Sequence, residues 1–340
     1  LQTPLYLAGR PQVVGGSLGL VVSDSGEESA EELLRNADVA MYMAKGEGKG
    51  RYAVFEPAMH ASMRVRLELT ADLQRALDGN QFILHYQPTV DLTTERVLGA
   101  EALVRWNHPT RGLIAPGEFI QIAEETGLIV PLGWWVLEEA CRQGMVWQAR
   151  YAADPPLTIS VNLSMRQLHD SDVVERVAHT LHVSGLTPTS LVLEITESAL
   201  MLDAEWTIGR LREVKGLGVQ IALDDFGTGY SSLSYLQRLP VDILKIDRSF
   251  VAGVARGTEE SALAHAIIRL GSALHLQVIA EGVEHHDQLV QLRALGCRRG
   301  QGFYFAHPMT VKAMADVLRS GTFDRAQPRD RPHPQAVERA

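Results

Sequence analysis

The residues best suited to chemistry are polar side chains that follow apolar stretches of the sequence. These stretches are expected to be buried strands, and the polar residues near their ends are Glu101, Asn162, Glu194, Asp224 with Asp225, Lys245 with Asp247, and Glu281. Burying an unpaired carboxylate is unfavourable, so several of them at one place require cations. Their candidate metal ligands are all oxygen atoms, which hard ions such as Mg²⁺ and Mn²⁺ prefer. The pattern therefore predicts a divalent-metal site.

Each of these residues alone also has a purely structural explanation. A glutamate at a strand end is often a surface residue or half of a salt bridge. Asn162 could form a turn, and Lys245 with Asp247 could be an internal ion pair. Their joint occurrence at the same end of successive strands favours a shared site.

The elements that hold these residues follow from the alternation of strand-like and helix-like segments. Strands are expected over residues 83–90, 98–105, 158–163, 191–196, 220–225, 243–247, 277–281 and 302–306, with helices between most of them. This alternation predicts an α/β fold, a TIM (β/α)8-like barrel whose chemistry lies at the C-terminal ends of its strands. Residues 91–97 are too few for a parallel crossover, so the barrel should be a modified one that contains one antiparallel strand.

The remaining segments suggest how the chain is organised. Residues 1–57 should form a partial α+β unit, too small for an independent domain, and residues 58–80 a linker helix. The barrel is expected over 81–320, and the Pro-, Arg- and Asp-rich residues 321–340 should be a disordered tail.

Composition limits the possible partners and location. A formal net charge of -9 and a pI near 5.8 argue against binding to polymeric nucleic acid. No apolar run approaches the roughly 20 residues of a membrane span, and the two cysteines fit a reducing, cytoplasmic compartment. Because the chain begins in mid-domain, we expect that sensory or membrane-anchoring regions could precede it.

Seven motifs carry a resemblance to a known family. They are "EALVRW" at 101–106, "VNLS" at 161–164, "LEITES" at 193–198, "DDFGTGYSSLSYL" at 224–236, "LKIDRSFV" at 244–251, "AEGVE" at 280–284 and "QGFYFAHPM" at 301–309. In this order they resemble the signature set of EAL-domain phosphodiesterases. In addition, "SLGL" at 17–20 and the sequence at 37–56 resemble the C-terminal end of a GGDEF domain, whose own signature is absent from the chain.

The resemblance implies hydrolysis of cyclic di-GMP to linear 5′-pGpG with two Mg²⁺ or Mn²⁺ ions, and inhibition by Ca²⁺. It implies metal ligation by Glu101, Asn162, Glu194, Asp224, Asp225, Asp247 and Glu281, with Lys245, Glu281, Glu101 and Asp225 as catalytic residues. Arg105, Gln87 and Gln301 are expected to bind substrate. Glu284 should orient the ligands, and Glu197 should anchor a loop that contains Gly227, Thr228 and Gly229.

Two further expectations concern activity and assembly. A cyclic di-GMP receptor that binds without cutting is the alternative function, but degenerate members typically lose metal ligands and none is lost here. A homodimer is expected, in which segment 224–238 links association to catalysis. The apolar residues Leu236 and Leu239 should face either the barrel or a partner.

Overall fold

The structure is a computed structural model of the chain and describes residues 5–7, 10–12, 15–23, 28–46, 50–197, 204–227, 236–255 and 259–323. The chain divides into two compact units, Leu1–Asn80 with Gly117–Leu128, and Gln81–Pro116 with Ile129–Ala340. Of the tail expected over 321–340, residues 324–340 lie outside the described part.

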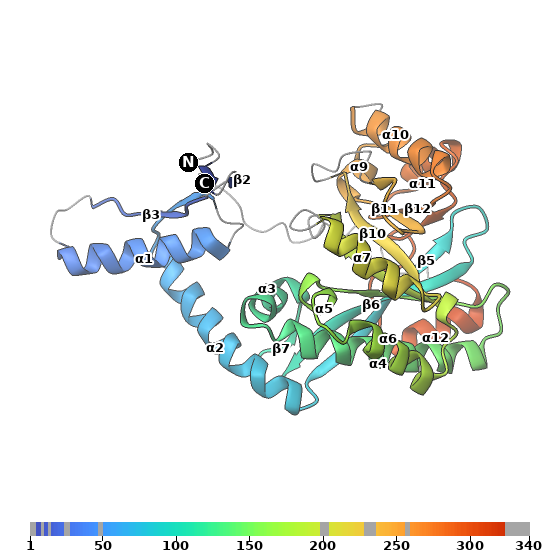
Figure 1. Cartoon of the computed structure of the whole chain (residues 1–340), viewed down its shortest axis with the longest axis horizontal. Coiled ribbons are helices and arrows are strands. Elements are labelled where there is room, and N and C mark those ends of the chain that lie inside the picture. The colour runs from blue at the N-terminus through green and yellow to red at the C-terminus, as the bar shows by residue number, and fades with distance from the viewer. Residues whose placement is uncertain are drawn as a thin grey trace. The chain divides into compact units, whose positions relative to one another are not determined.

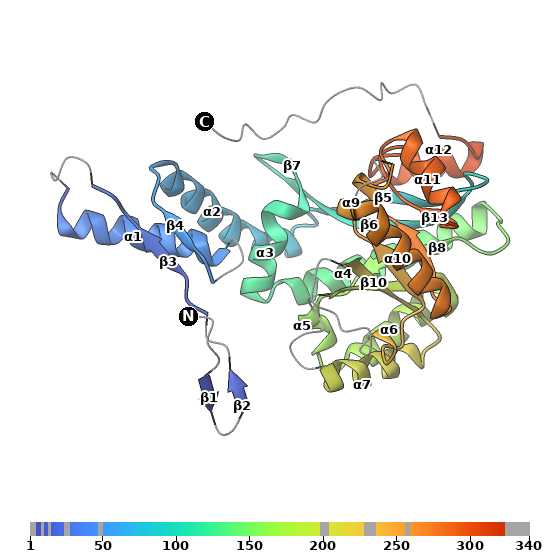
Figure 2. The ribbon, with the colours of Figure 1, turned by 90° about the horizontal axis from the view of Figure 1, so that it is seen from above.

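The first unit contains a small α+β arrangement. Strands β3 (Leu18–Leu20) and β4 (Tyr52–Val54) pair in parallel, and helix α1 (Ala30–Gly46) connects them and lies along them (Figure 2). A Cβ atom at Gly19 would lie 1.9 Å from the Ala37 carbonyl oxygen, so the close packing of the helix on the strand requires a glycine. The unit therefore contains a βαβ arrangement formed by β3, α1 and β4.

The same unit contains a hairpin and two further helices. Strands β1 (Leu5–Leu7) and β2 (Arg10–Gln12) pair antiparallel, and they are followed in this unit by α2 (Ala58–Asp78) and α3 (Pro116–Thr126). The Arg66 guanidinium lies 2.7 Å from the Glu125 carboxylate, which links α2 to α3.

The second unit is a barrel surrounded by helices (Figure 1). Its strands are β5 (Phe82–Asp91), β6 (Val97–His108), β7 (Gly112–Ile114), β8 (Thr158–Asn162), β9 (Leu191–Thr196), β10 (Gln220–Phe226), β11 (Ile243–Ile246), β12 (Gln277–Ala280) and β13 (Arg299–Gly300). Its helices are α4 (Ile129–Arg150), α5 (Met165–Leu168), α6 (Val173–Ser184), the 3-10 helix η1 (Pro188–Ser190), α7 (Ala204–Lys215), α9 (Arg248–Ala252), α10 (Glu259–Ala273), α11 (His286–Ala294) and α12 (Val311–Ser320).

The barrel closes through β5, which pairs with both β6 and β13. Both of these pairings are antiparallel, whereas the six pairings that run from β6 through β8, β9, β10, β11 and β12 to β13 are parallel. The prediction of a TIM-like barrel with one antiparallel strand is confirmed. The short 91–97 connection allows no other arrangement, because a parallel crossover needs about a dozen residues.

The eighth strand differs from the prediction. It is β13, and residues 302–306 instead form a turn in which the amides of Phe305 and Ala306 donate to the Gly302 carbonyl. The Tyr304 amide also donates to the carbonyl of Val283, 2.8 Å away. The aromatic stretch indicated a strand by composition, but these contacts with the neighbouring loop remove its backbone from the sheet.

Among the described residues, no helix has the length and apolarity needed to cross a membrane.

Candidate active site

The floor of the candidate site is an apolar layer inside the barrel. Val192, Ala222, Ile243 and Ile279 form one buried cluster, and each comes from a different parallel strand. Side chains two positions apart on a strand share a face. The residues two positions later, listed in the same strand order, are Glu194, Asp224, Lys245 and Glu281. The strands therefore place a polar layer directly above the apolar one, at their C-terminal ends.

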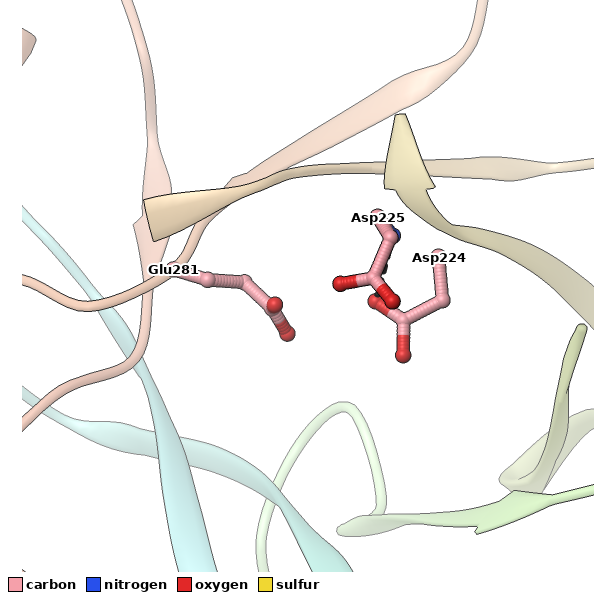
Figure 3. A group of neighbouring side chains, drawn as sticks. All are labelled: Asp224, Asp225 and Glu281. Carbon is pink, nitrogen blue, oxygen red and sulfur yellow. Dashed lines mark hydrogen bonds between the residues drawn. The ribbon is translucent and has the colours of Figure 1, made fainter. Parts of the chain in front are cut away.

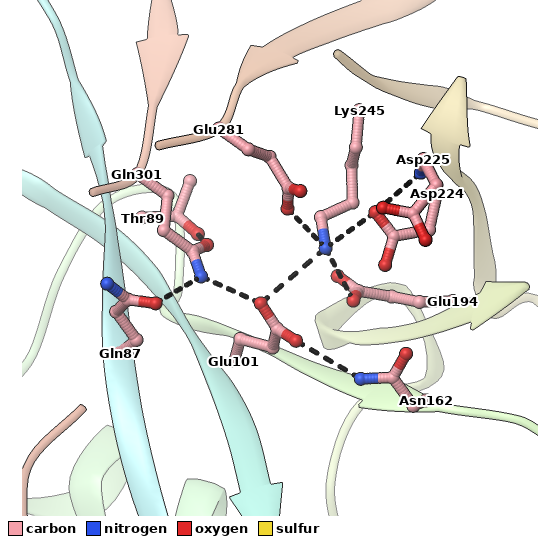
Figure 4. A network of polar contacts seen from close by, with 10 residues as sticks. All are labelled: Gln87, Thr89, Glu101, Asn162, Glu194, Asp224, Asp225, Lys245, Glu281 and Gln301. Atoms are coloured by element: carbon pink, nitrogen blue, oxygen red, sulfur yellow. Dashed lines mark hydrogen bonds and ion pairs between the residues drawn. The ribbon is translucent and has the colours of Figure 1, made fainter. Parts of the chain in front are cut away.

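Lys245 lies at the centre of this polar layer (Figure 4). Its side chain is fully buried, and its Nζ atom lies 2.7 Å from carboxylate oxygens of both Glu194 and Glu281, 3.2 Å from Asp224 and 3.5 Å from Glu101. Burial alone lowers the pKa of Lys245, but these four carboxylates outweigh that effect and raise the pKa well above the ordinary lysine value. The ammonium therefore stays charged and holds the four acidic groups together.

A second set of hydrogen bonds fixes both oxygens of Glu101 (Figure 4). Gln301 donates from Nε2 to Glu101 Oε2 at 2.7 Å and to Gln87 Oε1 at 3.0 Å, and Asn162 Nδ2 donates to Glu101 Oε1 at 3.1 Å. Thr89 completes the set by donating from Oγ1 to Gln301 Oε1 at 3.1 Å. Thr89 was not among the predicted site residues, although its position two residues after Gln87 places both side chains on one face of β5.

Asp224 and Asp225 both face the site even though they are adjacent in β10 (Figure 3). Adjacent side chains on a regular strand point to opposite faces. Here the pairing with β11 shifts register between Leu223 and Phe226, and Asp225 has φ 54°, in the left-handed region. This bulge re-aims one carboxylate, and the strained backbone is of the kind that occurs at functional sites.

Burial and mutual repulsion disfavour the charged forms of these acids. Burial is the largest cause for each, and it raises the pKa of Glu194 well above its ordinary value and that of Glu281 to about 8. The pKa of Asp225 is also raised, by burial and then by the charges of Asp224 and Asp247. The site thus gathers more negative charge than the single positive charge of Lys245 can neutralise.

The donor set and its charge both fit hard divalent cations. One oxygen from each of Asp224, Asp225 and Glu281 lies within 4.8 Å of the others. With Glu101 and Glu194 ionised as well, five carboxylates surround one ammonium, and two divalent cations would neutralise the four charges in excess. The Oδ1 atom of Asn162 adds an oxygen that accepts no hydrogen bond among the described residues.

Two other acidic residues act on the backbone nearby. Asp247 accepts from the Ser249 amide at 3.0 Å and so caps α9, while it remains close enough to Asp225 to raise the pKa of that acid. Glu197 is buried and accepts from the Gly227 amide at 2.8 Å. The loop residues Thr228 and Gly229 lie outside the described residues.

A cavity of about 300 Å³ opens above the carboxylates. Nine of the predicted site residues line it: Gln87, Glu101, Asp224, Asp225, Lys245, Asp247, Glu281, Glu284 and Gln301. Five further residues that were not predicted also line it: Leu103, Arg248, Gly282, Gly302 and Phe303. Arg105 is half-buried and donates to the Val104 carbonyl at 2.8 Å, outside this lining set. Leu103 follows Glu101 by two residues on β6, and residues at this spacing share a face of a strand. This spacing could have identified Leu103 as a lining residue.

Comparison with known proteins identifies relatives of this chain. Residues 70–308 match the protein family described as EAL domain. The chain is 44% identical over 310 residues to the bifunctional diguanylate cyclase/cyclic di-GMP phosphodiesterase MucR of Pseudomonas aeruginosa, covering 91% of this chain and 45% of MucR. It is 40% identical over 328 residues to the cyclic di-GMP phosphodiesterase NbdA of the same organism, covering 96% of this chain and 42% of NbdA. The chain thus spans less than half the length of these curated relatives.

A solved structure also resembles this chain. The PaMucR phosphodiesterase in complex with c-di-GMP has a TM-score of 0.69 and 45% sequence identity, covering 73% of this chain and 99% of that one.

Proposed function

Because the chain belongs to the EAL domain family, we propose that it hydrolyses cyclic di-GMP to linear 5′-pGpG. The observation that carries this proposal is the convergence of acidic side chains from separate strands on one buried ammonium, beneath a cavity at the C-terminal ends of those strands. The names of two relatives, both cyclic di-GMP phosphodiesterases, and the ligand in the PaMucR structure support the substrate.

The proposed metal ligands are the residues that sequence analysis indicated. When bound there, two Mg²⁺ or Mn²⁺ ions would activate water and neutralise charge that develops on the phosphate. Glu101, Asn162, Glu194 and Asp224 would form one set of ligands, and Asp225 would complete the second site, with Asp247 and Glu281 nearby.

The reaction adds water to one phosphodiester and breaks the bond between phosphorus and the ribose 3′ oxygen. The linear product then carries a 5′-phosphate and a 3′-hydroxyl. Lys245 has a pKa well above neutrality, so it does not act as a base. It would donate to the water or to a phosphate oxygen once bound cations take over its carboxylate partners. The surrounding carboxylates are the groups that can accept a proton from the water and return it to the leaving 3′ oxygen.

The hydrogen-bonded side chains of Gln87 and Gln301 keep Glu101 in place during this reaction. Gln301 bonds to both Glu101 and Gln87, and Gln87 in turn donates to the Ala306 carbonyl at 3.0 Å. These bonds restrict the Glu101 carboxylate to one orientation, which preorganises it as a ligand.

Incubation of the protein with cyclic di-GMP and Mg²⁺, followed by chromatographic separation of the products, tests the proposal. We expect pGpG from the wild type, and none from Glu101→Ala or in excess chelator. Binding of cyclic di-GMP without conversion would identify a receptor instead, and the absence of both would refute the proposed substrate.

We also propose that the protein works as a homodimer in the cytoplasm. Leu236 and Leu239 are buried within the chain itself, so no partner is needed to cover these two side chains. Support for the dimer therefore comes from the family resemblance, and an active monomer in sedimentation at assay concentration would reject it. Two free, buried cysteines, Cys141 and Cys297, are consistent with a reducing compartment.

A further inference from the structure

Among the described residues that line the cavity above the carboxylates, one cationic side chain makes no ion pair or hydrogen bond with the rest of the described chain. Among the described residues that line it, two carry a positive charge, Lys245 and Arg248. Lys245 is 1% exposed and contacts four carboxylates. Arg248 is exposed, and its guanidinium makes no ion pair or hydrogen bond within the described part of the chain.

Arg105, the arginine expected to hold a substrate phosphate, is placed differently. Its guanidinium already donates to the carbonyl of Val104, and its side chain is not part of the cavity lining. Burial lowers the pKa of Arg105, which indicates a partly desolvated position. Arg248 is therefore the cavity-lining cation with donors available for a ligand.

The backbone of Arg248 is held at the cavity by two local features. Asp247 accepts from the Ser249 amide and so fixes the turn that begins α9. On the other side the backbone of Gly282 lies against Arg248, because a Cβ atom on Gly282 would lie 2.4 Å from the Arg248 Cβ and 3.2 Å from its Cα. Gly282 directly follows Glu281, so Arg248 is anchored beside one of the site's carboxylates.

An anionic substrate needs positive charge in this cavity. Each half of a cyclic dinucleotide carries a phosphodiester, whereas the cavity lining includes five aspartates and glutamates besides Glu284: Glu101, Asp224, Asp225, Asp247 and Glu281. Cations bound to those carboxylates would be largely neutralised by them, so a further positive group would strengthen the binding of the substrate. An arginine presents several donors in a planar fork that matches phosphate oxygens.

We propose that Arg248 binds a phosphate of the cyclic dinucleotide and thereby sets the affinity of the site for its substrate. This inference rests on the proposed function. It concerns a residue within the "LKIDRSFV" motif that neither the ligand set nor the hydrogen-bond network around Glu101 uses.

Steady-state kinetics and calorimetry with cyclic di-GMP test this role. Arg248→Gln should raise KM and Kd roughly tenfold, which is about 1.4 kcal/mol, because a charge-assisted hydrogen bond to the phosphate is lost. The value of kcat should stay within about twofold of wild type. The KM and Kd of Arg248→Lys should lie between those of the wild type and of Arg248→Gln, since lysine keeps the charge but lacks the planar fork of donors. The control is Arg269→Gln, which removes an exposed arginine of α10 outside the cavity lining and should leave all constants unchanged.

The salt dependence of KM provides a second readout. Loss of a phosphate contact should make KM less sensitive to ionic strength, because a screened charge interaction has been removed. An unchanged Kd in Arg248→Gln, or a weakening with the salt dependence of the wild type, would overturn the inference.

The outcomes separate this inference from the proposed function. If the wild type hydrolyses cyclic di-GMP and Arg248→Gln has wild-type KM and Kd, only the role of Arg248 fails. If the wild type binds without hydrolysis, the proposed activity fails and the Kd comparison still decides the role of Arg248. If the wild type does not bind cyclic di-GMP at all, both fail.

Discussion

Replacing Glu281 by glutamine should stabilise the metal-free protein while abolishing its turnover. The Glu281 carboxylate lies 2.7 Å from Lys245 Nζ and belongs to the acidic group around Asp224 and Asp225. A glutamine has nearly the same shape, and its amide oxygen can still accept from Lys245. The substitution removes one negative charge from a group that has too many, but it also removes a ligand that the reaction needs.

The size and pH dependence of this gain follow from the pKa of Glu281. Burial, helped by the charges of Asp224 and Glu101, raises the pKa of Glu281 from 4.5 to about 8 in the folded protein. Stability linked to this group is therefore fully present below pH 4.5 and is lost as the pH rises through about 8. That shift sets an upper limit of about 5 kcal/mol at 1.36 kcal/mol per unit. The side chain is 19% exposed to water, so we expect about 2 kcal/mol, or a melting temperature raised by roughly 4–8 °C.

Thermal unfolding in excess chelator at pH 5.5 and pH 8.5 measures this effect. Glu281→Gln should melt above wild type at pH 8.5, with a smaller difference at pH 5.5. The control is Glu138→Gln, at an exposed glutamate of α4, which should change little at either pH. Saturating Mg²⁺ should reverse the order, because it binds the wild type more tightly. If Glu281→Gln melts at or below wild type at pH 8.5 in chelator, the charge-excess argument is wrong.

Three further predictions concern the bulge, the glutamine network and the metals. Asp225→Gly should gain about 1 kcal/mol of stability because glycine adopts φ 54° without strain. The same variant should lose turnover by orders of magnitude. A melting temperature below that of the wild type would argue against backbone strain at Asp225. Gln301→Ala removes one donor from Glu101 and one from Gln87 and should cost about 1–3 kcal/mol of stability and reduce kcat. A wild-type melting curve would contradict the network's role. Turnover should require Mg²⁺ or Mn²⁺. Ca²⁺ should support binding of cyclic di-GMP better than its hydrolysis, because Ca²⁺ accepts a looser coordination geometry. Full activity in excess chelator would exclude the two-metal mechanism.

The barrel could be predicted because its evidence is local. Each parallel strand is a short apolar run bounded by turn residues, and the brief 91–97 connection required an antiparallel hairpin. The eighth strand could not be located in this way. Its two paired residues, Arg299–Gly300, are followed by the aromatic residues Phe303, Tyr304 and Phe305, which resemble a strand more closely than the strand itself does. The hydrogen bonds from Phe305 and Ala306 to the Gly302 carbonyl, together with that from Tyr304 to Val283, make the segment a turn.

The sequence by itself determined which groups are available and where along each strand they stand. Val192 and Glu194, Ala222 and Asp224, Ile243 and Lys245, and Ile279 and Glu281 are each two residues apart, so the period of a strand stacks a polar layer on an apolar one.

Tertiary structure decided how those groups meet. The same two-residue period would send Asp225 to the opposite face from Asp224, and only the bulge in the pairing of β10 with β11 turns it into the site. Likewise, nothing local places Thr89 on Gln301, or the backbone of Gly282 against Arg248. These contacts join residues far apart in the chain, and they exist only because barrel closure brings the strand ends into one ring.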